Sequence, residues 1–172
     1  QGLAALALTD HDDLGGAVRF AFKAREMEEF AGIIGLEATI AHAEDDRHLT
    51  LLARDAQGYA NLSQLVTLSR ANLPRGRPRV SLEQLAVHHE GLLCLSGCPR
   101  GEIPRAIARG DSLGARRAGG HLKDIFGEQF AIEVMDHGLP EEAAWSEGLI
   151  ELAGDLGVPW VVTNNAHYAR AG

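Results

Sequence analysis

Residues that could bind a metal stand at the ends of several short apolar runs in this sequence. His11 follows the first run, Glu37 lies near the end of the second, and Cys98 follows the fourth. The later runs are followed by Asp136, His137, Asn165 and His167. Imidazole, carboxylate and thiolate groups together suit zinc or another divalent transition metal, such as manganese, and not calcium or magnesium. Two or three such ions could hold a phosphate ester and activate water against it.

Each candidate also has a structural explanation. A single histidine after a strand is more often a hydrogen-bonded surface or core residue than a ligand, and Cys98 alone would most often be an inert buried thiol. Glu37 could pair with an arginine. The repetition of such residues at successive strand ends favours a metal site. Four further histidines are interpreted as structural or solvated: His42, His88, His89 and His121.

His48 differs from the other candidates because it begins its apolar run. If that strand runs opposite to its predecessor, its first residue could approach Glu37. A tight hairpin would instead leave the two residues several positions apart along the strand, at about 3.3 Å per residue. The sequence leaves both geometries open.

The apolar runs have lengths and β-branched contents that are typical of strands. They cover residues 3–8, 32–40, 48–53, 91–96, 130–135 and 159–163. Segments of helical period separate most of them and cover residues 14–29, 57–71, 81–88, 102–108, 112–126 and 141–156. Asp12 or Asp13 would cap the first helix, and Ser81 with Gln84 forms a capping-box pattern at the third. This alternation predicts an α/β protein with a largely parallel sheet, whose C-terminal strand ends share one edge.

The connection between the second and third runs breaks this alternation. Ten residues separate Glu37 from His48, too few for a crossover helix between parallel strands. We expect a hairpin or a reversed strand here, with a polar turn at residues 44–47, and therefore a mixed sheet.

Length and composition indicate a single domain covering residues 1–172, with no membrane-spanning segment. Two cysteines are too few for a disulfide framework, so a reducing, cytoplasmic setting is expected. The formal charge of −8 argues against binding a phosphate backbone unaided. Arg70, Arg75, Arg77 and Arg79 are a local exception: the cluster is either a solvated loop or, through Arg75, Arg77 and Arg79, a contact with DNA or an acidic protein surface.

Short motifs follow one another along nearly the whole chain. They are Ala7-Leu8-Thr9-Asp10-His11, Ile33-Ile34-Gly35-Leu36-Glu37, His48-Leu49-Thr50-Leu51-Leu52-Ala53, Gly58-Tyr59-Ala60-Asn61-Leu62, Leu95-Ser96-Gly97-Cys98, Asp136-His137-Gly138-Leu139-Pro140-Glu141 and Thr163-Asn164-Asn165-Ala166-His167-Tyr168. In this order they resemble the PHP (polymerase and histidinol phosphatase) domain of bacterial DNA polymerase III α subunits. The number and order of the motifs make the resemblance specific.

The resemblance implies a distorted seven-stranded β/α barrel with a metal cluster at the C-terminal ends of its strands. The family's ligand positions fall on His11, Glu37, His48, Cys98, Asn165 and His167. The family has a His-x-His strand ahead of Ala7, and with the sequence starting at Gln1 we expect the barrel to lack this first strand and its ligands. Asn165 stands where the family has aspartate, and a neutral amide is a weaker ligand. We therefore expect an incomplete, degenerate metal site.

The main functional hypothesis is an N-terminal accessory domain of a DNA-directed DNA polymerase, a nucleotidyltransferase. The domain would act mainly as a scaffold, would meet DNA through the parent, and would have the remaining polymerase domains as partners. Exposed barrel edges would favour self-association. Asn165 and the Gly76-Arg77-Pro78 segment resemble the error-prone branch more than the replicative one. The alternatives are a free-standing phosphoesterase, such as a histidinol phosphatase, and an interaction module whose metal residues only brace the fold.

Overall fold

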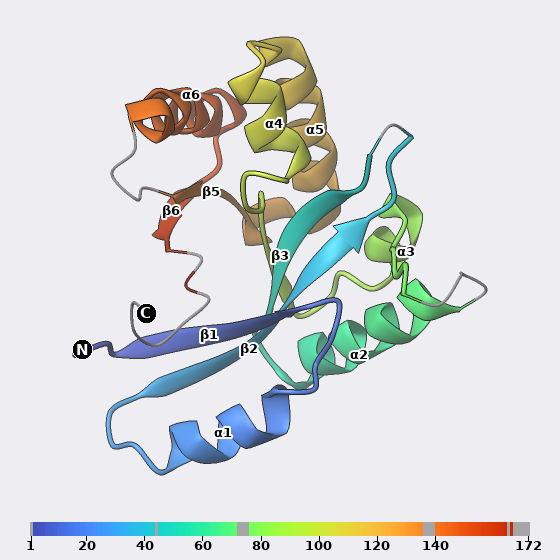
Figure 1. Ribbon diagram of the computed structural model, residues 1–172, viewed down its shortest axis with the longest axis vertical. Coiled ribbons are helices and arrows are strands. Elements are labelled where there is room, and N and C mark those ends of the chain that lie inside the picture. The colour runs from blue at the N-terminus through green and yellow to red at the C-terminus, as the bar shows by residue number, and fades with distance from the viewer. Residues whose placement is uncertain (1, 44, 72–75, 136–139, 165, 167–172) are drawn as a thin grey trace.

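The computed structural model describes residues 2–43, 45–71, 76–135, 140–164 and 166, and the side chains of all of these except 140–144 (Figure 1). The strands are β1 (Ala5–His11), β2 (Ala31–Ile40), β3 (Arg47–Ala53), β4 (Leu92–Leu95), β5 (Phe130–Met135) and β6 (Trp160–Thr163). The helices are α1 (Ala17–Arg25), α2 (Ala56–Arg70), α3 (Leu82–Val87), α4 (Glu102–Ala108), α5 (Ser112–Phe126) and α6 (Pro140–Leu156). Every strand and helix expected from the sequence is present; the limits of β1 and α1 differ from the expected ones by two to four residues, and all others agree within one residue.

The strands form one curled sheet of six strands in sequential order, β1 to β6. Neighbours are parallel except around β3, which is antiparallel to both β2 and β4. The short connection after β2 therefore leads into a reversed strand, and the expectation of a mixed sheet is confirmed. The curled α/β sheet also agrees with the expected barrel fold, as a half-barrel of six strands.

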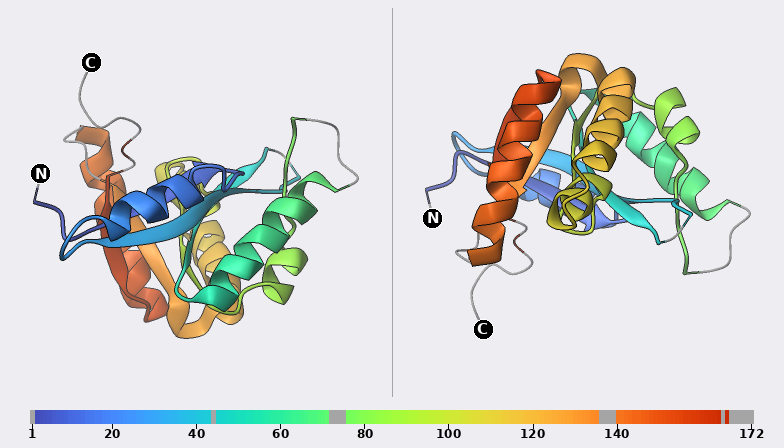
Figure 2. Two further views of the ribbon diagram at one scale, coloured as in Figure 1. Left: turned by 90° about the horizontal axis from the view of Figure 1, so that it is seen from below. Right: turned by 90° about the horizontal axis from the view of Figure 1, so that it is seen from above.

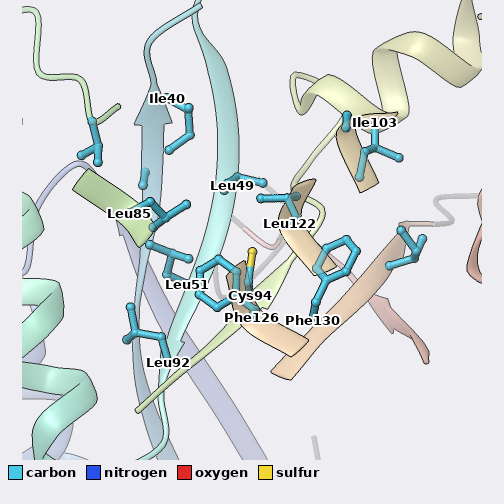
Figure 3. Close-up of a cluster of buried hydrophobic side chains, with 14 of the residues drawn as sticks. Ile40, Leu49, Leu51, Leu85, Leu92, Cys94, Ile103, Leu122, Phe126 and Phe130 are labelled. Atoms are coloured by element: carbon cyan, nitrogen blue, oxygen red, sulfur yellow. The ribbon is translucent and has the colours of Figure 1, made fainter. Parts of the chain in front are cut away.

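One face of the sheet packs against the helices and forms the apolar core. Alternate strand residues point to opposite faces, and the core-facing set is Leu36, Ala38, Ile40, Leu49, Leu51, Leu92, Cys94, Phe130, Ile132 and Val134. Figure 3 shows part of this cluster, in which Leu85 of α3 and Leu122 and Phe126 of α5 meet the strand residues. The opposite face carries polar residues from the same strands, and these build the site described below.

The helices group at two ends of the sheet. Helices α1 and α2 lie beneath β1 and β2 in the view of Figure 1, whereas α4, α5 and α6 gather beside β5. In Figure 2, α1 and α2 face the viewer when the molecule is seen from below, and α4, α5 and α6 face the viewer when it is seen from above. Within the described ranges, none of the helices has the length and apolar composition that crossing a bilayer requires.

Local hydrogen bonds explain where two of the helices begin. The side chain of Asp55 accepts a hydrogen bond from the Gly58 amide at the start of α2. Ser81 and Gln84 form the reciprocal capping box predicted for α3. Both caps satisfy backbone amides that would otherwise lack a partner in the first helical turn.

The predicted start of the first helix is wrong. Helix α1 begins at Ala17, and its N-cap is Gly16, which makes no side-chain cap. The carboxylate of Asp12 is engaged elsewhere, because it accepts hydrogen bonds from Thr39 of β2. Asp12 therefore belongs to the site and not to the helix.

Candidate metal centre

Glu37 occupies the middle of the polar face because of the sheet register. In the parallel pair of β1 and β2 it lies directly beside His11. In the antiparallel pair of β2 and β3, His48 lies opposite Thr39, two positions from Glu37 on the same face. Such diagonal neighbours lie about 7–8 Å apart at Cα, within reach of long side chains. The reversal of β3 thus answers the open question about His48: its strand starts at the edge where β1 ends.

The side chains of these residues meet. His48 Nδ1 lies 2.5 Å from Glu37 Oε1, and His48 Nε2 lies 3.1 Å from His11 Nε2. One ligand atom from each of the three residues lies within 4.8 Å of the others. His48 is buried, Glu37 is half-buried and His11 is exposed. The cluster is therefore anchored in the sheet and open to solvent on one side.

Cys98 completes the cluster from the loop after β4. Its Sγ donates a hydrogen bond to Glu37 Oε1 at 3.3 Å and lies 3.5 Å from His48 Nδ1. The loop reaches this position through Gly97, whose φ is +90°. A Cβ built on Gly97 would lie 2.3 Å from the His48 carbonyl oxygen, so a larger residue would push the loop away. Glycine is needed here both for its backbone angle and for the close approach.

The pKa values of Glu37 and Cys98 are shifted in opposite directions. The hydrogen bond with His48 lowers the pKa of Glu37 below its ordinary value, against the opposing effect of burial. Glu37 is therefore an ionised acceptor. Burial raises the pKa of the Cys98 thiol to about 12, and the charge of Glu37 adds to this. Without a metal the sulfur is a thiol, and binding a cation would release its proton, because thiolate is the form that binds metals.

The donor set fits one transition-metal ion. Two imidazoles and a carboxylate have ligand atoms within 4.8 Å of one another, and the Cys98 sulfur lies beside the carboxylate, a combination of donors typical of zinc and similar ions. The 3.1 Å between the two Nε2 atoms is close to the separation of about 3.3 Å for two nitrogens bound tetrahedrally at about 2.0–2.1 Å. If both Nδ1 atoms carry protons, the two Nε2 lone pairs face each other, and a cation between them removes that repulsion.

A second buried carboxyl group, Glu133 of β5, lies on the same face. Its Oε2 accepts a hydrogen bond from Thr50 Oγ1 at 3.1 Å, and its Oε1 accepts one from Thr163 Oγ1 at 2.6 Å. Glu133 is 4% exposed, and burial raises the pKa of its carboxyl group. It lines a small cavity of about 60 Å³ together with Cys98 and Trp145. This cavity adjoins the cluster on the β5 side.

The sequence reasoning missed Asp12 and Glu133. Asp12 Oδ2 lies 2.9 Å from His11 Nδ1, and it was interpreted as a helix cap. Glu133 is flanked by apolar residues in its strand, so nothing in its local pattern marks it as part of a site. For Asp12 a signal was available, because an acid next to a candidate ligand histidine is placed to orient it.

The remaining candidates are placed as follows. Asn165, His167, Asp136 and His137 lie outside the described residues, and so does Arg75. Arg77 is exposed, and Arg79 forms an ion pair with Asp46 at 3.3 Å. Both belong to the segment between α2 and α3, which supplies none of the described site residues. A nucleic-acid or partner contact by these arginines stays a prediction.

Comparison with protein families supplies the context for this cluster. The PHP domain model matches residues 1–137, which include His11, Glu37, His48 and Cys98. The chain belongs to the PHP domain family. The resemblance found in the sequence motifs is thereby confirmed.

Curated relatives of this PHP domain are DNA polymerases. The chain is 41% identical to a DNA polymerase III subunit alpha of Treponema pallidum, over 98% of the chain and 15% of that protein. It is 39% identical to an error-prone DNA polymerase of Symbiobacterium thermophilum, over 97% of the chain and 16% of that protein. It is 41% identical to a DNA polymerase III subunit alpha of Thermus aquaticus, over 96% of the chain and 14% of that protein. The chain thus spans about one seventh of the length of these relatives.

A solved structure supports the fold. The PHP domain aligns with an amidohydrolase from Chromobacterium violaceum, which was solved with bound sulfate and no metal, at a TM-score of 0.55. The alignment covers 96% of this chain and 77% of the other, with 16% sequence identity. At this identity the likeness concerns the fold alone.

Proposed function

We propose that this PHP domain is an accessory domain of a DNA polymerase of the III alpha type. The observation that carries the proposal is the match over 96–98% of the chain to proteins of which it covers 14–16%. The domain would work in the cytoplasm beside the polymerase domains and meet DNA through them. Both polymerase branches match at similar identity, so the error-prone assignment rests on Asn165 and the Gly76-Arg77-Pro78 segment alone.

The gene provides the most direct test of this parent. We expect the open reading frame to continue beyond Gly172 for several times the length of the chain, through a region with the acidic metal site of a polymerase. A stop codon shortly after Gly172 would contradict the proposal. It would favour a free-standing phosphoesterase, such as a histidinol phosphatase.

Within the polymerase, we propose that the domain acts mainly as a scaffold that holds one metal ion. His11, Glu37, His48 and Cys98 would be its ligands, and Asn165 and His167 would complete the family's set. A transition metal bound there would supply Lewis acidity. Among the described residues, His11, Glu37 and His48 form one group that could hold an ion, whereas a two-metal clamp needs two ions about 3.5–4 Å apart.

Metal content tests the first part of this proposal. We expect elemental analysis of the purified chain to give at most one zinc or manganese ion per molecule, and dialysis against a chelator to remove it. His48→Ala should abolish binding, because the His48 ring touches both Glu37 and His11. His121→Ala is the matched control, since His121 is not in the cluster. Two or more tightly held ions per chain would contradict a degenerate site.

Hydrolysis tests the second part. We expect no robust turnover of a generic phosphate ester by the chain in the presence of zinc or manganese. The reason is that a single ion cannot clamp both the attacking and the leaving oxygen. Turnover that requires the metal and disappears in His11→Ala would overturn the scaffold role and support the phosphoesterase alternative.

Self-association is the third expectation. In the described part of the chain, β1 and β6 are the outer strands of the sheet, and each pairs on one side. Apolar side chains of these strands are exposed, among them Leu6, Trp160 and Val162. Because an unpaired strand edge invites pairing with another chain, we expect light scattering over a dilution series to detect oligomers. A monomer at every concentration would show that the edges are protected.

A further inference from the structure

Four side chains form a continuous chain of contacts across the mouth of the site. Asp12 Oδ2 lies 2.9 Å from His11 Nδ1, and His11 Nε2 lies 3.1 Å from His48 Nε2. His48 Nδ1 in turn lies 2.5 Å from Glu37 Oε1. Each imidazole therefore has a carboxylate at Nδ1 and presents Nε2 to the gap between the rings. Glu37 is a family ligand, whereas Asp12 has no role among the residues that the family pattern supplies.

The carboxylate of Asp12 is itself fixed by β2. Its Oδ1 accepts a hydrogen bond from the Thr39 amide at 2.8 Å, and its Oδ2 accepts one from the Thr39 hydroxyl at 2.7 Å. The backbone amide of Asp12 donates to the Glu37 carbonyl at 2.9 Å. Asp12 is 6% exposed, so these hydrogen bonds replace the contacts that its carboxylate would make with water. The residue after β1 is thereby bonded to β2 at Glu37 and at Thr39.

The backbone of Asp12 is also unusual. Its φ is +52°, in the left-handed region that residues other than glycine seldom adopt. Glycine would take this conformation without strain and would allow the same turn after β1. A turn alone therefore does not require aspartate. An aspartate adds the two hydrogen bonds that its carboxylate accepts from Thr39 and the 2.9 Å contact of its Oδ2 with His11 Nδ1.

We propose that Asp12 is a positioning residue for the metal site, which holds the His11 ring with its proton on Nδ1 and its Nε2 lone pair directed at the metal gap. The inference rests on the proposed metal site and extends it to a residue that is not a ligand. A carboxylate only accepts hydrogen bonds, so the Asp12 carboxylate 2.9 Å from His11 Nδ1 favours the tautomer with the proton on that nitrogen. Neutral imidazole then has its lone pair on the other nitrogen, Nε2, which is the atom that faces His48. Carboxylates in this position fix the tautomer and orientation of metal-binding histidines.

Asp12→Asn gives a sharp test because it preserves shape. Asparagine tolerates a positive φ, and its oxygen can still accept from the Thr39 amide. Its amide NH₂ group, however, would face the His11 ring as a donor. It would favour the tautomer with the proton on Nε2, which cannot bind a metal through that atom. Asp13→Asn is the matched control, because Asp13 is exposed and its carboxylate pairs with Arg70.

The experiment measures zinc affinity by competition with a chromophoric chelator for the wild-type chain, Asp12→Asn, Asp12→Gly and Asp13→Asn. Loss of such a carboxylate typically weakens metal binding about 10–100-fold. We expect a loss of at least about tenfold in both Asp12 variants and wild-type affinity in the control. Thermal unfolding of the metal-free chains separates this effect from misfolding, since Asp12→Gly also relieves the backbone strain.

A second readout needs no metal. Nitrogen-15 spectra of the imidazoles, recorded above the ordinary histidine pKa of about 6.5, distinguish the two tautomers. We expect His11 to carry its proton on Nδ1 in the wild-type chain and on Nε2 in Asp12→Asn. The same tautomer in both chains, or equal zinc affinity of the two, would overturn the role of Asp12 while leaving the metal site intact. A folded wild-type chain that binds no zinc would instead refute the metal site itself.

Discussion

On the face of the sheet that the helices cover, successive strands present leucine, isoleucine and phenylalanine, whereas the same strands present histidine, glutamate and threonine on the other face. Leu36 and Leu51 lie on the first face, and their chain neighbours Glu37 and Thr50 lie on the second. The first face is held by apolar burial, which is not directional. The second is held by hydrogen bonds whose donors and acceptors must match in position.

Substitutions on the two faces should therefore change different properties, stability on the apolar face and charge on the polar face. An apolar core tolerates changes of side-chain shape poorly, so a substitution there lowers stability. It does not alter the residues that would bind the metal. A change on the polar face alters charge and proton positions at a small cost in packing. Glu37 and Glu133 show this within the second face, because a histidine partner lowers the pKa of the first and burial raises the pKa of the second.

The largest effect is expected on the core face. Leu51 is fully buried, and Leu51→Ala should lower the free energy of unfolding by about 2–5 kcal/mol through lost burial and the cavity left behind. Urea denaturation should show a lower midpoint. Thr50→Val, its neighbour on the polar face, should cost about 0.5–1.5 kcal/mol through one lost hydrogen bond to Glu133. Equal losses for the two variants would abolish the contrast between the faces.

The next largest effect is expected for Gly97→Ala, because this substitution forces the loop that carries Cys98 away from the sheet. The strain of a positive φ in a residue other than glycine costs about 1–3 kcal/mol, and the new Cβ would also collide with the His48 carbonyl. We expect lower thermal stability together with weaker zinc binding. Gly120→Ala in α5, where a Cβ meets nothing within 4 Å, should instead stabilise by about 0.4–1 kcal/mol. Unchanged zinc affinity in Gly97→Ala would mean that the loop does not position the sulfur.

Glu37→Gln tests the polar face through the pH dependence of the free energy of unfolding. Because the folded-state pKa of Glu37 is lowered, its stabilisation is present above the unfolded-state pKa and is lost as the pH falls through the folded-state value. The variant should be less stable at neutral pH by about 1.5–3 kcal/mol, the usual contribution of a hydrogen bond to a charged group. Denaturation at a series of pH values should show the two chains converging in acid. A constant difference at every pH would contradict a lowered pKa of Glu37.

Glu133→Gln should have the smallest effect and the opposite sign. The folded-state pKa of Glu133 is raised, so its neutral form favours folding below the unfolded-state pKa, and this advantage is lost as the pH rises through the folded-state value. Glutamine mimics the neutral acid, so the variant should gain stability relative to wild type as the pH rises. The same pH series measures this. A variant that loses stability relative to wild type as the pH rises would contradict the raised pKa of Glu133.

Much of the fold could be predicted because each strand and helix has a clear period. The strand at 130–135 and the helices at 102–108 and 112–126 have the predicted limits. The first helix was predicted to start too early because the residues before Ala17 have a helical period, yet the Asp12 carboxylate bonds to the sheet and does not cap a helix. Local pattern cannot reveal a hydrogen bond between residues that are 27 positions apart.

The sequence indicated which residues belong to the candidate site better than it indicated how they lie in space. The sequence identified His11, Glu37 and Cys98 from their places after strands, and the structure brings them together. The approach of His48 depended on the register of a reversed strand, which polar turn residues do not specify. Asp12 and Glu133 lacked a motif, because their roles arise from partners on other strands.

The reversal of β3 also sets the order in which the site can assemble. Glu37 and His48 are 11 positions apart and are joined by a hairpin, whereas His11 is 37 positions from His48 and Cys98 is 61 from Glu37. Closing a longer loop costs more entropy, and hairpins form within about 1–10 μs. During synthesis on the ribosome, the Glu37–His48 pair can therefore form before Cys98 has been added to the growing chain.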